Sequence, residues 1–365
     1  MISEGRRGRS RAGLPPLRLD HLRRMTDHIG VMQHAFYAVP DRRHGYSVDD
    51  QARALIACLA HARSTGQSHA PPDAYTYLAY LRHATNPDGS VHNFLSFDGR
   101  RLDERGSEDA QGRTLWALGY AVRYGLDDGL IVAARELFDA VLQFTYTLRA
   151  PRAWSFVLFG LYHRLQVSAE PVLFELVHDL AQCLLVHLET ASTPDWHWFE
   201  PLLTYCNAKL PAALLLAHEL TGESRYREGG LDALSWLSTV VFNDQGDLRL
   251  VGQNGWYPRG GQKAAFDEQC VDAQGTVEAA LLAHRLTGDK VWGDRALAAF
   301  AWFHGRNVHG LSLIDPDTWG CADGIRASGL NRNMGAESII CYVLAYLDLA
   351  AAGLISVNGE QPADG

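Results

Sequence analysis

The hydrophobic positions of this chain follow a helical period almost throughout. Apolar residues recur every three or four positions, which is typical of helices that bury one face. The pattern predicts a short helix around residues 21–26 and eleven longer ones. The longer helices are expected at 49–65, 73–85, 108–124, 128–148, 152–166, 169–191, 200–221, 224–241, 271–287, 290–305 and 336–352.

The helices are predicted to pair into repeated hairpins. Segments 213–222 and 280–288 are nearly identical, which indicates an internal repeat. Four helices are expected to end at a C′ glycine, namely Gly66, Gly125, Gly222 and Gly288. One helix of each hairpin begins near positions 49, 108, 153, 207, 272 and 337, so successive starts lie 45 to 65 residues apart. Six such hairpins predict an all-α fold, a closed (α/α)6 toroid in a single domain.

The connections predict which face of the ring carries function. Turns leaving these six helices are short, whereas the segments leading into them include 87–106, 242–270 and 306–335. These exceed the usual connection of about 4–6 residues. The long loops and the N-termini of the inner helices therefore share one face, where a rigid scaffold would support a site.

Acidic residues stand at the start of four inner helices. They are Asp49, Asp50, Glu108, Asp109, Asp272 and Glu337. Adjacent residues point about 100° apart on a helix, so only one of each acidic pair can face the axis. We expect Asp50 and Asp109 to do so, with Asp49 and Glu108 in support. The alternative is that these carboxylates only cap helices or pair with Arg53 and Arg113.

The loops supply side chains suited to a sugar. Aromatic rings stack on the C–H faces of pyranoses, while amide, imidazole and guanidinium groups bond to hydroxyls. The substrate-binding candidates are His34, His44, Tyr46, His92, Trp198, Asn207, Trp256, Tyr257, Arg259, Asn331 and Asn333. This mixture predicts an oligosaccharide or glycan substrate.

Composition excludes several other partners. A net charge of −9 gives no basic field for nucleic acid, and no apolar run is expected to reach the ~18 residues of a membrane span. The six cysteines lack metal-ligand spacing, which predicts free thiols, a cytoplasmic location, and neither a metal nor another cofactor. The oligomeric state is left open.

The ends of the chain differ from its middle. Residues 1–17 are rich in arginine and lack the apolar stretch of a signal peptide, so they are predicted to form a disordered basic arm. The barrel domain is expected to span residues 18–354. Residues 355–365 are expected to form a flexible tail.

Several motifs together resemble a known family. They lie at 21–35, 40–55, 107–113, 256–261, 266–269, 320–324 and 331–338. These stretches are similar to a bacterial family of helical-toroid proteins found beside, or fused to, glycosyltransferases. The resemblance implies a glycan-active, glycoside-hydrolase-like toroid. Two positions depart from the family pattern: Gln51 stands where the family has Asn, and Cys206 where it has Asp.

These observations favour a glycoside hydrolase. Cleavage needs one carboxylic acid to protonate the leaving oxygen and one carboxylate to activate water or attack carbon. We expect this pair to come from Asp50, Asp109, Asp272 and Glu337, which should converge in one cleft rimmed by Trp256, Trp198 and His92. A sugar epimerase or isomerase, which usually employs histidine bases, is the first alternative. A non-catalytic glycan-binding partner of a glycosyltransferase system is the second, consistent with Cys206.

Overall fold

The computed structural model of the protein describes residues 14–356, so the outer parts of the expected arm and tail, residues 1–13 and 357–365, lie outside it. The described part contains twelve α-helices, as predicted. They are α1 (Asp20–Met25), α2 (Val48–Ser64), α3 (Pro72–Ala84), α4 (Glu108–Tyr124), α5 (Asp128–Leu142), α6 (Pro151–Leu165), α7 (Pro171–Ala191), α8 (Lys209–Thr221), α9 (Ser224–Val241), α10 (Cys270–Thr287), α11 (Lys290–Ala301) and α12 (Ala336–Ala351).

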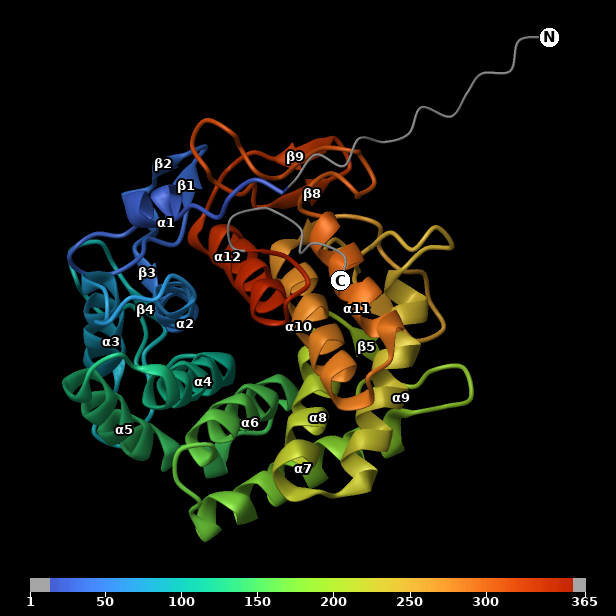
Figure 1. Cartoon of the computed structure of the whole chain (residues 1–365), viewed down its shortest axis with the longest axis horizontal. Helices are drawn as coiled ribbons and strands as arrows, with labels where there is room; N and C mark the ends of the chain where they lie inside the picture. The colour runs from blue at the N-terminus through green and yellow to red at the C-terminus, as the bar shows by residue number, and fades with distance from the viewer. Residues whose placement is uncertain (1–13, 357–365) are drawn as a thin grey trace.

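The even-numbered helices form a closed inner ring (Figure 1). Each packs on the next, from α2 through α4, α6, α8 and α10 to α12, and α12 packs back on α2. Helices α3, α5, α7, α9 and α11 lie outside, and α1 packs against α12 to complete the sixth hairpin. The predicted (α/α)6 toroid is therefore confirmed. The arm, barrel and tail boundaries at 17 and 354 remain predictions.

The inner helices are buried over more of their surface than the outer helices, and their sequences differ accordingly. Outer helix α5 buries one stripe, formed by Leu130, Ala134, Leu137, Phe138 and Val141. Inner helices are enclosed by both neighbours and an outer helix, so α4 is buried continuously from residue 109 to 119. This explains why the inner helices read as nearly continuous apolar and alanine-rich segments.

Small residues set the closest helix approach in the ring. A Cβ atom on Gly119 of α4 would lie 2.2 Å from the carbonyl oxygen of Gly160 on α6. Only glycine at both positions lets these backbones meet. At the opposite face, Gly222 and Gly288 end α8 and α10 in the left-handed conformation, as predicted, whereas Gly125 has φ −58° and ends α4 without it.

Some predicted boundaries were wrong. The helix expected at 128–148 ends at Leu142 and is followed by a 3-10 turn, Thr145–Thr147. The helix expected from residue 200 begins only at Lys209, because the preceding segment forms strand β5 (Leu202–Leu203) and loops. The helix expected at 290–305 ends at Ala301.

One helix also corrects the expectation about apolar runs. Pro171–Ala191, helix α7, is long and apolar enough to cross a membrane by length and composition alone. In the ring it is an outer helix that packs on α6, α8 and α9. Burial of its apolar face against these helices accounts for its composition.

The long loops carry short antiparallel strand pairs. β1 (Ala35–Phe36) pairs with β2 (Val39–Pro40), and β3 (Tyr46–Ser47) pairs with β4 (Phe94–Leu95). β5 pairs with β6 (Tyr257–Pro258), and β8 (Gly324–Arg326) lies between β7 (Glu268–Gln269) and β9 (Gly329–Asn331). The pairings β3–β4, β5–β6 and β7–β8 join loops of different hairpins and so fix the rim around the inner-helix N-termini.

Candidate functional site

A cavity of about 510 Å³ opens where the N-termini of the inner helices meet. Four carboxylates from three helices converge on it, and polar and apolar residues of neighbouring loops complete the wall. The lining residues are Asp49, Ser107, Glu108, Asp109, Arg113, Ala150, Tyr205, Gln269, Val271 and Glu337. Of the four carboxylates expected to converge in one cleft, Asp109 and Glu337 line the cavity, whereas Asp50 and Asp272 do not. The catalytic role of these carboxylates remains a prediction.

The orientation of the first acidic pair is the reverse of what was expected. Asp49 lines the cavity, whereas Asp50 is buried behind its wall. One Asp50 oxygen accepts the Ser47 hydroxyl proton at 2.6 Å, and the other accepts from Arg53 at 3.1 Å. Burial raises the pKa of Asp50 to about 6, although Arg53 opposes the shift. Asp50 is thus held in the scaffold by a cap and an ion pair.

The second acidic pair divides two tasks. Glu108 accepts the backbone N–H groups of Arg149 and Ala150, at 2.7 and 2.6 Å, and so fixes the segment just before α6. Asp109 accepts a hydrogen bond of 2.9 Å from the Tyr205 hydroxyl. Burial raises the pKa of Asp109 even though Arg113 lies close to it. Burial thus favours the protonated form of the Asp109 carboxyl.

Glu337 sits in the opposite electrostatic environment. Its carboxylate accepts a hydrogen bond of 3.0 Å from Arg53, and its side chain is 42% exposed toward the cavity. Burial alone would raise the pKa of Glu337, but Arg53 and Arg113 outweigh it and the net shift is downward. The electrostatic interaction with His34 also contributes to the lowering of the Glu337 pKa.

Asp272 stands beside the cavity but does not line it. Its Oδ1 accepts a long hydrogen bond of 3.4 Å from the backbone N–H of Asn207, and its buried Oδ2 has no hydrogen-bond partner among the described residues. Burial raises the pKa of Asp272 to about 7. The carboxyl is consequently easy to protonate near neutral pH.

Three buried arginines hold the acidic residues in place. Arg53 bridges Asp50 and Glu337. Arg152 donates to Glu200 at 2.6 Å and to the carbonyl oxygen of Tyr205 at 2.7 Å. The third is Arg113. The contact of Arg53 with Asp50 matches the alternative that arginines pair with the acidic residues. Arg152 lies outside the acidic pairs and adds contacts that position Tyr205.

Arg113 faces both the cavity and Cys206. Its Nη2 donates to the Cys206 sulfur at 3.4 Å, and its Nε lies 3.9 Å from Asp49, without a hydrogen-bond partner in the described structure. Burial raises the pKa of the Cys206 thiol to about 11, so the group is neutral near pH 7. Cys206 therefore contributes no negative charge at this position near neutral pH.

Four predicted substrate-binding residues are committed to the scaffold instead. Trp198 is fully buried against Trp236, at 5.9 Å between ring centroids. Tyr46 is buried and donates its hydroxyl proton to Asp27, and His92 is buried with Nδ1 2.5 Å from the Asp103 carbonyl oxygen. Asn207 is also buried, and its side-chain oxygen accepts from the Thr204 N–H at 3.2 Å. The expected rim role of Trp198 and His92 is thereby wrong.

The other predicted binders do not line the cavity. Trp256 lies 6.4 Å from the Tyr205 ring and is the nearest aromatic candidate, while Tyr257 packs its edge on Trp196 at 5.3 Å. Arg259 donates to the carbonyl oxygen of Ala191 at 2.8 Å.

The remaining candidates hold the loop next to α12. His34 and His44 meet edge to face at 4.7 Å. Asn333 accepts the backbone N–H of Tyr37 at 3.0 Å, and the Asn331 carbonyl oxygen accepts the N–H of Asp323 at 3.0 Å.

Tyr205 and Gln269 line the cavity but were not among the candidate site residues. Gln269 appeared only within the motif at 266–269. The available signal was their position just before an inner helix, close to the positions that identified the carboxylates.

With respect to metals, no group of three or more His, Cys, Asp and Glu side chains within residues 14–356 is placed to hold an ion.

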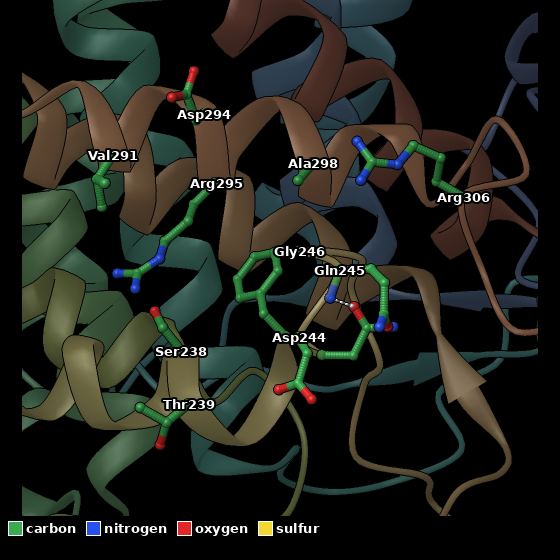
Figure 2. Close-up of a pocket in the computed structure, with 12 residues that line it drawn as sticks. Ser238, Thr239, Asp244, Gln245, Gly246, Val291, Asp294, Arg295, Ala298 and Arg306 are labelled. Atoms are coloured by element: carbon green, nitrogen blue, oxygen red, sulfur yellow. Dashed lines mark hydrogen bonds between the residues drawn. The ribbon is translucent and has the colours of Figure 1, made fainter. Parts of the chain in front are cut away.

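A second cavity, of about 500 Å³, lies between the outer helices α9 and α11 (Figure 2). Arg295 extends from α11 toward Ser238 on α9, and Arg306 at its edge pairs with Asp247 at 2.5 Å. None of the predicted site residues lines it. Its position outside the inner ring separates it from the gathered carboxylates, so the first cavity is the candidate site.

Comparison with known proteins relates the chain by shape alone. No protein-family model matches it, and no curated protein matches it in sequence. A cellobiose 2-epimerase from Bacillus thermoamylovorans superposes with a TM-score of 0.68 and 14% identity, covering 90% of this chain and 95% of that one. A D-mannose isomerase superposes with a TM-score of 0.66 and 14% identity, covering 91% and 96%.

A GH76 alpha-mannanase from Bacteroides thetaiotaomicron is also similar in shape. Its TM-score is 0.62 at 11% identity, with 91% of this chain and 93% of that one covered. Such low identities establish a shared toroid fold, and a fold by itself does not define a reaction. The chemistry has to be argued from the site.

Proposed function

We propose that this protein cleaves a glycosidic bond in an oligosaccharide, with Asp109 as the general acid and Glu337 as the ionised carboxylate. The observation that carries the proposal is the pair of opposed environments in one cavity. Burial raises the pKa of Asp109, whereas Arg53 and Arg113 lower that of Glu337. Two carboxyl groups whose environments drive their pKa values apart provide an acid and a base at the same pH.

Each group then has a defined task. Protonated Asp109 gives its proton to the glycosidic oxygen as the C–O bond breaks. Glu337 either takes a proton from the attacking water or attacks the anomeric carbon itself. Arg53 keeps Glu337 ionised, and Tyr205 orients the Asp109 carboxyl. The carbohydrate-active neighbours of the same fold support a sugar as the substrate class.

A sugar epimerase or isomerase is the second candidate, because proteins described as a cellobiose 2-epimerase and a D-mannose isomerase are among the structural neighbours. Proton abstraction from an open-chain sugar usually relies on histidine. None of the ten residues that line the cavity is a histidine, which favours hydrolysis. Association with a glycosyltransferase system and a cytoplasmic location remain predictions.

One experiment separates these reactions. The purified protein is incubated with a panel of oligosaccharides and aryl glycosides, with and without phosphate, and the products are followed by ¹H NMR. New reducing ends are expected. A sugar phosphate would indicate phosphorolysis, an isomerised sugar would favour the second candidate, and an unchanged panel would contradict the proposal.

Variants then test the two residues. Asp109→Asn and Glu337→Gln should each lower kcat by about two to four orders of magnitude, the usual contribution of acid–base groups. Glu136→Gln, at an exposed position of outer helix α5, is the matched control and should leave the rate unchanged. Near-normal rates in both cavity variants would refute the assignment.

A further inference from the structure

Exposed aromatic side chains gather on two adjoining loops of the long-loop face. Phe36 and Tyr37 belong to the β1–β2 hairpin, and Phe94 and Phe97 belong to the loop that contains β4. Their exposed fractions are 64%, 53%, 39% and 38%. We refer to these four residues as the aromatic rim. Exposed apolar groups that cluster in this way commonly mark a binding surface.

The two loops lie side by side. Strand β3, which follows the hairpin, pairs with β4, so that Ser47 lies opposite Phe94. The Arg42 guanidinium lies over the Phe97 ring at 5.1 Å, and the Phe36 and Tyr37 rings meet edge to face at 5.0 Å. The two loops are therefore neighbours, and their four exposed rings lie on the long-loop face.

The two loops are joined on two sides to segments that reach the cavity. The backbone N–H of Tyr37 donates to Asn333, and its carbonyl oxygen accepts the N–H of Met334, both at 3.0 Å. That segment leads directly into α12 and Glu337. On the other side Ser47 precedes Asp49, which also lines the cavity.

The hairpin holds Tyr37 in an unfavourable conformation. Its φ is 52°, in the left-handed region that favours glycine. The two hydrogen bonds to residues 333 and 334 maintain this backbone, and the ring stays exposed. A non-glycine residue kept in such a conformation often serves binding.

The side chains of the aromatic rim favour an uncharged ligand. Asp41 and Arg43, which lie on the same loop, pair with each other at 2.5 Å, and Arg42 is engaged with Phe97. Apart from the charge of Arg42 over Phe97, the aromatic rim thus offers apolar ring faces. Such faces stack well on the C–H faces of neutral pyranose units.

We propose that the aromatic rim is a second binding site, which holds the part of a neutral glycan chain that extends beyond the cavity. The ligand assignment rests on the proposed function. The cavity is of the size that takes a small ligand. A glycan longer than a disaccharide extends from the cavity across the aromatic rim, so the protein favours oligosaccharides over disaccharides.

The variants Phe36→Ala and Tyr37→Gly test this proposal. The second removes a ring at a position where glycine suits the backbone, so the fold is not strained by the change. Tyr75→Ala is the control, since Tyr75 is an equally exposed aromatic residue at the start of outer helix α3, on the short-turn face. Thermal unfolding checks that all variants remain folded.

The first measurement is kcat/KM against oligosaccharides of two to eight units. The double variant should lose about 2- to 12-fold per ring on the long substrates, as expected for aromatic stacking, and nothing on a disaccharide. Equal losses at every length, or no loss, would overturn the proposal. Light scattering is run in parallel, and a wild-type dimer that the double variant disrupts would show that the rim binds a second copy instead.

The second measurement needs no turnover. Native gels cast with soluble mannan, β-glucan or xylan should retard the wild type and Asp109→Asn, and the double rim variant should migrate freely. This result separates the two hypotheses, because retardation without any product would contradict hydrolysis and leave the rim supported. Absence of wild-type retardation in every polysaccharide would overturn the rim.

Discussion

Asp272 provides a sharp test of the electrostatics of the site. Burial raises its pKa from 3.8 to about 7, so the folded protein retains a proton that the unfolded chain releases near pH 4. Stability contributed by the protonated carboxyl is therefore lost as the pH rises from about 4 to 7. Above that range the free energy of unfolding is lowered by the full cost of ionising the buried carboxyl.

The magnitude follows from the shift. At about 1.4 kcal/mol per pKa unit, the cost is roughly 4 kcal/mol at pH 8 and roughly 1.5–2 kcal/mol at pH 5. Asp272→Asn carries no titrating group at this position. Between pH 5 and 8 the free energy of unfolding should therefore fall by about 2–3 kcal/mol more in the wild type than in Asp272→Asn.

Urea unfolding followed by circular dichroism of the helices measures this difference. Asp128→Asn is the matched control, since Asp128 also lies in the first turn of a helix but is exposed. It should reproduce the wild-type pH dependence. Parallel pH curves for the wild type and Asp272→Asn would refute the reasoning and show that solvent reaches the Asp272 carboxyl.

Three further results are expected. Tyr205→Phe removes the hydroxyl group that donates to Asp109, and loss of this donor favours the protonated form of the Asp109 carboxyl. The alkaline limb of the kcat/KM profile should therefore move up by roughly half to one pH unit, and an unmoved limb would exclude Asp109 as the titrating acid. Gly119→Ala should lower the free energy of unfolding by about 1–3 kcal/mol or more, because its Cβ would meet the Gly160 backbone; unchanged urea midpoints would contradict the tight α4–α6 contact. Dialysis against EDTA should leave activity intact, and loss restored by zinc or calcium would show a metal requirement.

The fold was predictable because its signals are local. Apolar spacing marks each helix, the repeat marks the hairpin, and loop length separates the two faces. Acidic residues at inner-helix N-termini point to one end of the ring whatever the details of packing. The boundary at Lys209 was missed because strand β5 is formed only by pairing with distant β6.

Side-chain direction at the site was not predictable in the same way. Whether Asp49 or Asp50 faces the cavity depends on a rotation of about 100°, which the contacts of Ser47 and Arg53 decide. Trp198 looked like a free loop aromatic, but its burial depends on Trp236 of α9. Such contacts join residues far apart in sequence, and periodicity carries no information about them.

The sixth hairpin joins the two ends of the chain, and this shapes how the protein is made. The His21 ring nitrogen lies 2.7 Å from the carbonyl oxygen of Met334, a contact across 313 residues. During synthesis the early hairpins can pack on one another, but α2 has an open flank until α12 leaves the ribosome. Glu337 belongs to that last helix. Completion of the site and closure of the ring therefore coincide, so a nascent or C-terminally truncated chain holds an open arc of helices with no working cavity.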